Sequence, residues 1–118
     1  MVSKFMDNSK DPKYYCNKIL EDIIFCIKHL ENETVDSFNH DEVLNSAISF
    51  KFIQISESAK NLPDVFFQTY PCIPRQQING MRNRIVHEYG SVNLDIIFNT
   101  VKEDFPKLAH DLAIIIKD

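Results

Sequence analysis

Residues 94–115, LDIIFNTVKEDFPKLAHDLAII, are the part of the sequence that decides the fold class. Their apolar side chains recur at alternating steps of four and three residues, which places them on one face of an α-helix. The residues of this seam are Leu94, Phe98, Val101, Phe105, Leu108, Leu112 and Ile115. Pro106 lies within the stretch, but the seam keeps its phase across it, so we expect a kinked helix and not a reversal of the chain.

An earlier helix is predicted to begin at Asp11-Pro12. An aspartate there accepts from the free amides of the first turn, and proline is tolerated at a position whose N–H has no partner. The apolar spacing that follows predicts a helix over residues 12–31. The polar stretch 33–40 breaks this period, and Asn39, with a glutamate three residues later, resembles a capping box for the next helix.

That second helix keeps its apolar spacing up to Pro63, which ends it. Residues 63–74 hold three prolines and several large apolar residues, so we expect a short helical turn and an extended connection. Pro74 can open a third helix, and Gly90 is a natural stop for it. Gly80 inside this helix costs up to about 1 kcal/mol relative to alanine, which predicts that another helix approaches closely there.

The composition agrees with a helical domain. Among 118 residues there are two glycines, too few for the many tight turns of a β-sandwich. The fold class is therefore predicted as all-α, a bundle of four long helices plus a short helix, in a single domain over residues 1–118. The net charge of -4 argues against a protein that coats nucleic acid, yet Arg75, Arg82 and Arg84 share one ten-residue window that contains no acid.

Several classes of site and location are not indicated. The N-terminal residues lack the apolar core of a signal peptide, and no apolar run is long enough to span a bilayer, so we expect a cytoplasmic protein without a membrane partner. Cys16, Cys26 and Cys72 form no Cys-x-x-Cys pair, and Cys26 is interpreted as a core residue. No helical zinc motif is present, so we expect neither a metal nor a cofactor.

A polar cluster lies on the third predicted helix, at residues 81–90, MRNRIVHEYG. Asn83 and His87 are four residues apart and share a face, so the amide can orient the imidazole. Arg82 and His87 are five apart and diverge by about 140° on a regular helix. Either the helix distorts near its end, or two copies of the chain meet about a twofold axis and bring both pairs into one cleft.

This cluster suits the cleavage of RNA without metal. Arginine binds phosphate through its planar fork, and a histidine can exchange a proton at neutral pH. With His87 as general base or acid and Arg82 on the scissile phosphate, the 2′-hydroxyl of RNA can attack that phosphate. Arg84 and Arg75 are candidates for further phosphate contacts. The alternative is a solvated helix face that includes Arg82, Arg84 and Glu88.

Residues 78–89, INGMRNRIVHEY, resemble the signature of the HepT-like toxins among the HEPN-domain ribonucleases, in which an arginine is followed by four to six residues and a histidine. Here the pair is Arg82 and His87, and Tyr89 completes the pattern. Two further blocks, residues 55–62 and 104–108, also resemble that family, although Ser56 stands where the family usually has glycine.

The resemblance implies a dimeric HEPN bundle with metal-independent endoribonuclease activity and Arg82 and His87 as catalytic residues. It further implies the toxin of a type VII-like toxin–antitoxin pair, neutralised by an MntA-like nucleotidyltransferase antitoxin that transfers AMP to Tyr89. Asn83 matches the polar residue that usually follows the arginine, and Glu57 either supports the site or braces the helices. The alternative function is a non-catalytic helical module that binds such a nucleotidyltransferase.

Overall fold

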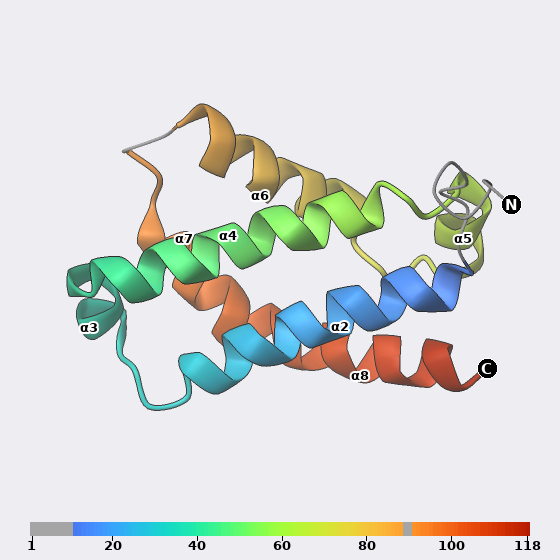
Figure 1. Ribbon diagram of the computed structural model, residues 1–118, viewed down its shortest axis with the longest axis horizontal. Helices are drawn as coiled ribbons and strands as arrows, with labels where there is room; N and C mark the ends of the chain where they lie inside the picture. Colours follow the sequence, from blue (N-terminus) through green and yellow to red (C-terminus); the bar gives the residue numbers. More distant parts are fainter. Residues whose placement is uncertain (1–10, 89–90) are drawn as a thin grey trace, which may run out of the picture.

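Helices are the only regular elements in residues 11–88 and 91–118, the part of the chain that the computed structural model describes (Figure 1). Four long helices form the bundle: α2 (Pro12–His29), α4 (Glu42–Ala59), α6 (Arg75–His87) and a C-terminal helix made of α7 (Leu94–Asn99), the π-helical turn η1 (Thr100–Asp104) and α8 (Phe105–Lys117). The short helices are α3 (Val35–His40) and α5 (Asp64–Thr69). The predicted all-α bundle is confirmed, with two short helices where one was expected.

The C-terminal helix is continuous and buries its apolar seam. All seam residues from Phe98 to Ile115 are buried. The N–H of Phe105 donates to the carbonyl of Thr100, five residues back, so the chain takes one wide turn directly before Pro106. Proline has no backbone N–H, so the helix lacks one hydrogen bond at Pro106. A wide turn of this kind accommodates the missing bond. The expectation of a distorted but unreversed helix is thus confirmed.

The predicted break after the first helix is confirmed, because α2 ends at His29, but residues 35–40 of the polar stretch form the separate short helix α3, which was not predicted. Thr34 and Ser37 form the capping box of α3, each side chain accepting from the other residue's backbone N–H. Asn39 is inside α3 and does not cap the next helix, because Asp41 accepts from Leu44 at the start of α4. A Thr-x-x-Ser pair caps a helix in the same way as a Ser-x-x-Glu pair. One buried residue, Phe38, anchors the short helix to the core.

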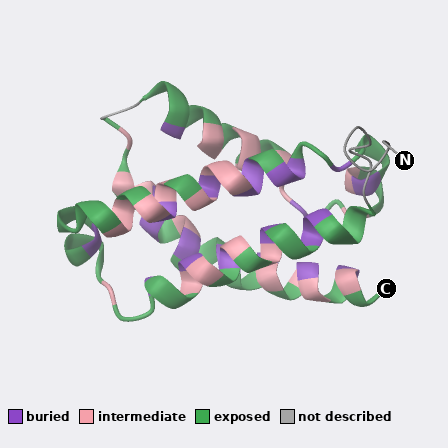
Figure 2. Cartoon of the chain, viewed as in Figure 1, coloured by how far each residue is buried: buried purple, intermediate pink, exposed green. Residues whose placement is uncertain are grey.

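The C-terminal helix joins the bundle through contacts far apart in the sequence, since α8 packs on α2 and α7 packs on α3. Helix α2 packs against both α4 and α8, and α4 packs in turn against α6. The ring of Phe52 in α4 stacks on Phe105 of α8 with centroids 5.1 Å apart. Helix α6 lies at the edge of the bundle, and Ile85 is its one buried residue (Figures 1 and 2). This edge position leaves most of the α6 surface open.

The structure tests one of the two predictions made for the glycines. A Cβ placed on Gly80 would meet no other atom within 4 Å, so no helix of the same chain approaches it and that prediction was wrong for the single chain. The reason is the edge position of α6, where Gly80 is exposed beside an open groove. The predicted helix stop at Gly90 lies outside the described residues.

Candidate functional site

Helix α6 carries most of the candidate site, and its sequence explains its position. Ile78, Met81 and Ile85 give it a narrow apolar side that joins the core, while its remaining residues are mainly polar. A helix with such a narrow apolar stripe packs on one neighbour and keeps its other faces in solvent. The side chains of Asn83, Arg84 and His87 are therefore exposed.

Arg82 lies on the side of α6 that faces α4. Its Nε is 3.8 Å from Oε2 of Glu57, and its side chain is 27% exposed. That Nε has no hydrogen-bond partner among the described residues. Since 3.8 Å is too long for a hydrogen bond, the contact is a loose ion pair. Glu57 also contacts Lys60 at 3.3 Å, so it lies where it can brace α6 against α4 and still leave Arg82 donors available.

A second polar contact joins the same two helices. The Ser56 hydroxyl donates to Oδ1 of Asn79 over 3.4 Å, and Ser56 is fully buried. A buried hydroxyl without a partner costs free energy, so this contact favours one rotation of α6 about its axis. The rotation in turn sets the direction of Arg82, which is three residues after Asn79.

His87 is on a different face of the helix from Arg82. Helix α6 remains a regular α-helix as far as His87, so a distortion between the two residues does not bring them together within one chain. Asn83 shares the outward face with His87, but its amide oxygen accepts from Nη1 of Arg82 at 3.3 Å. The amide is thus placed between the two candidate catalytic residues.

The other two arginines are held differently. Arg75 donates to Asp64 of α5 over 2.8 Å, and its guanidinium lies 4.5 Å from the centroid of the Phe67 ring. It is twelve residues before His87, about 18 Å along the helix. Arg84 has no ion-pair partner among the described residues and lines a groove beside α6. Of the two predicted additional phosphate contacts, Arg84 is the one near His87.

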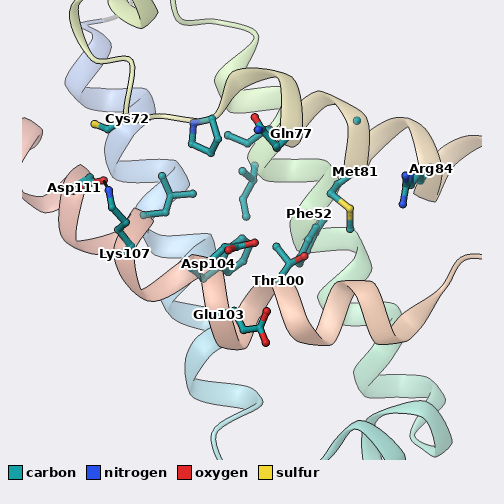
Figure 3. A pocket seen from close by; sticks show the side chains of 16 residues that line it. Phe52, Cys72, Gln77, Met81, Arg84, Thr100, Glu103, Asp104, Lys107 and Asp111 are labelled. Atoms are coloured by element: carbon teal, nitrogen blue, oxygen red, sulfur yellow. Dashed lines mark hydrogen bonds and ion pairs between the residues drawn. The ribbon is translucent and has the colours of Figure 1, made fainter.

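The groove lies between α6 and the C-terminal helix and has a volume of about 530 Å³ (Figure 3). Its floor is apolar and includes Phe52, Met81 and Phe105. The polar residues on its walls come from α6 and from η1 or α8; they are Gln77, Arg84, Thr100, Glu103, Asp104, Lys107 and Asp111. Sequence reasoning did not identify this groove, although residues 104–108 form one of the family-like blocks.

Lys107 and Asp111 pair at one end of the groove. The ammonium of Lys107 donates to the Asp111 carboxylate over 2.7 Å, and this hydrogen bond raises the pKa of Lys107. Since the pair satisfies both charges, neither is the first choice for binding a ligand. The unpaired groups of the groove lie toward η1 and Arg84.

Other expectations concern residues away from this face. Tyr89, the predicted modification target, lies outside the described residues. Cys16 and Cys26 are fully buried in the core, as expected for Cys26, and this burial raises the pKa of the Cys26 thiol to about 12 and that of Cys16 to about 11. Within residues 11–88 and 91–118, no group of three or more His, Cys, Asp or Glu side chains is arranged to hold a metal ion. No helix there has the length and apolarity needed to cross a bilayer.

Known proteins are similar to this chain over most of its length. The family model described as Ribonuclease HepT-like matches residues 9–115. The protein named "Putative RNase TTE0752" from Caldanaerobacter subterraneus is 32% identical over 108 residues, which cover 92% of this chain and 96% of that protein. The "Probable ribonuclease HepT" of Thermococcus cleftensis is 33% identical over 93 residues, or 75% of this chain and 84% of that protein. No solved structure gives a significant match.

Proposed function

Because the chain belongs to the ribonuclease HepT-like family, we propose that it is a metal-independent endoribonuclease in which Arg82 and His87 act on RNA. The observation that carries this proposal is the exposed position of His87 on α6, one turn after Asn83, whose amide oxygen accepts from Arg82. These are the positions that match the family's signature.

The proposed active site is composite and needs two copies of the chain. Arg82 and His87 diverge on a regular helix, so a single α6 does not direct both at one phosphate. The outward face of α6 carries exposed residues at steps of four and three, namely Gln76, Gly80, Asn83 and His87. With no side chain on Gly80, a second α6 can approach closely about a twofold axis. Two histidines and two arginines then share one cleft.

The chemistry follows from these groups. One His87 removes the proton from a 2′-hydroxyl, and the 2′-oxygen forms a bond to the adjacent phosphorus. The bond from phosphorus to the 5′-oxygen breaks, and the second His87 of the dimer gives that oxygen a proton. The two Arg82 guanidinium groups stabilise the negative charge that accumulates on the phosphate oxygens. No step requires a metal ion.

The decisive experiment is the substitution His87→Ala. It removes the proton-transfer group, so we expect RNA cleavage to fall at least about 100-fold, the usual contribution of general acid–base catalysis. Cleavage by the unaltered protein should persist in EDTA. His110→Ala serves as the matched control, because His110 is an exposed histidine on α8 away from the site. Undiminished cleavage by the His87→Ala protein would contradict the proposal.

The proposal extends to regulation. As a toxin of a type VII-like pair, the protein would be neutralised by a nucleotidyltransferase antitoxin that joins AMP to the hydroxyl of Tyr89. The added phosphate is negative and bulky, so it would compete with RNA for the arginines. After co-expression with the antitoxin, mass spectrometry should find one adenylyl group, absent from a Tyr89→Phe variant. An adenylyl group that persists in that variant would place the modification elsewhere.

The alternative function, a non-catalytic module that docks a nucleotidyltransferase, predicts a different result. In that case the purified protein cleaves no RNA, and the complex with the nucleotidyltransferase forms equally well with His87→Ala.

A further inference from the structure

The groove between α6 and the C-terminal helix has the size and lining of a ligand site. Its volume of about 530 Å³ is in the range of small-molecule pockets, about 300–1,000 Å³. The floor is apolar and is lined by the partly buried Ile78 and Met81 beside the buried, stacked rings of Phe52 and Phe105. An apolar floor between two helices favours a planar, weakly polar group. RNA-binding proteins commonly hold an unpaired base on such a surface.

Two polar groups on opposite walls are free to select the ligand. Asp104, at the end of η1, directs its carboxylate toward the groove, and Gln77 lies across from it on α6 (Figure 3). Among the described residues neither side chain has a hydrogen-bond partner. The Thr100 hydroxyl, by contrast, already donates to the carbonyl of Ile96. An ionised carboxylate only accepts hydrogen bonds. The ligand must therefore present N–H donors toward the η1 wall.

Guanine is the base that fits these acceptors best. Its Watson–Crick edge carries N1–H and the N2 amino group side by side, so one carboxylate can accept from both. Adenine and cytosine place a ring acceptor beside their amino group, which a carboxylate repels, and uracil has a single N–H between two carbonyls. From the opposite wall, the Gln77 amide can donate to N7 of guanine.

The charges around the groove set the orientation of a nucleotide. Glu103 and Asp104 place negative charge on the C-terminal wall, which repels phosphate, while Lys107 and Asp111 on the same wall neutralise each other. Arg84 lies on the α6 wall without an ion-pair partner among the described residues. A bound nucleotide therefore turns its phosphate toward α6 and its base toward η1. This direction leads the backbone to the helix that carries Arg82 and His87.

From these observations we infer that the groove is a subsite for a guanine base next to the scissile phosphate of single-stranded RNA. The inference rests on the proposed nuclease function and adds the sequence preference of that reaction. Asp104 is its specificity residue, Gln77 supports it, and Arg84 binds the adjoining phosphate.

The test compares two short single-stranded RNAs that differ at one position. Each is an oligouridylate with either one guanosine or one inosine, which lacks the N2 amino group. Good paired contacts to a base are worth about 1–3 kcal/mol, so the guanosine RNA should be cleaved about 5- to 150-fold faster. Asp104→Asn should reduce this ratio to about one, because an amide offers a single acceptor. Cleavage products are separated by gel electrophoresis.

Glu21→Gln is the control. It removes the same charge at an exposed position of α2, and Glu21 does not line the groove. We expect this variant to keep the preference for guanosine. Sedimentation velocity and thermal unfolding of all three proteins establish that fold and assembly are unchanged.

Two results overturn the inference. One is equal cleavage of both RNAs by the unaltered protein, and the other is an Asp104→Asn variant that keeps the full preference. If the assembly of that variant also changes, the groove is a protein contact. If Asp104→Asn does not fold, the affinities of the His87→Ala protein for the two RNAs are measured in its place. Equal affinities for the two RNAs would overturn the inference. Selective binding of the guanosine RNA without cleavage of either RNA would instead contradict the nuclease proposal and support the subsite.

Discussion

The three arginines of the acid-free window have three different environments. Arg75 is fixed by Asp64 and the Phe67 ring, Arg82 faces Glu57 across a loose 3.8 Å contact, and Arg84 is free of ion pairs among the described residues. A guanidinium that already has a close carboxylate partner must give it up to bind phosphate. The order of availability for RNA is therefore Arg84, then Arg82, then Arg75.

At this scale the sequence predicted the helix better than its contacts. Arg82, Asn83 and His87 lie on one helix as expected, and the helical period fixes their relative directions, but the choice of these residues as the site stays a prediction. The contacts of Asn79 with Ser56 and of Arg75 with Asp64 were not predictable, since each joins residues of different helices. Such pairs depend on how two helices pack, which a single helical period does not determine.

At the scale of the element, the C-terminal helix shows how a seam tolerates proline. The wide turn η1 directly before Pro106 keeps Val101, Phe105 and Leu108 buried on one side. The seam spacing predicted the continuity of this helix, but the π-helical turn was not specified by it. That turn also places Thr100 and Asp104 on the groove wall, so the part of the candidate site that sequence reasoning missed comes from a local irregularity.

The seam predicts that alanine substitutions at two apolar positions of α8 lower the free energy of unfolding by very different amounts. Phe105 is 5% exposed and packs on Phe52, whereas Ile114 is 49% exposed. Phe105→Ala should lower the free energy of unfolding by about 3–5 kcal/mol, because it leaves a cavity in the core. Ile114→Ala should change it by less than about 1 kcal/mol. Urea denaturation measures both, and similar losses at the two positions would contradict the assigned faces of α8.

At the scale of the whole molecule, Gly80 is more readily explained in an assembly than in one chain. It lowers the helix propensity of α6, and no neighbouring atom within the chain requires its missing side chain. In the proposed dimer the same position lies where the second α6 approaches. A residue that is unfavourable for the monomer and favourable for the pair is consistent with a site completed by two copies.

Gly80→Ala separates these two effects. In the monomer it should raise the stability of α6 by up to about 1 kcal/mol, because alanine is the better helix former and the methyl group meets no atom within 4 Å. In the dimer the methyl groups would separate the two helices, so we expect at least about tenfold weaker dimerisation and slower RNA cleavage. Sedimentation equilibrium and urea denaturation measure the two quantities. Ser46→Ala, at an exposed position of α4, controls for helix propensity alone.

A Gly80→Ala protein that dimerises and cleaves like the unaltered one would rule out an interface at this position. The glycine would then have no role in assembly, and the composite site would need a different pair of surfaces.

The pairing of α2 with α8 has a consequence for the protein during its synthesis. The first long helix buries part of its apolar face against the last one, so the core closes only after residues 105–117 have left the ribosome. Domains fold as units, and until then α2 and α4 lack the surface that completes them. An RNA-cleaving activity built on this fold would stay latent on the nascent chain, and the messenger RNA being translated would be exposed to it only after release of the finished domain.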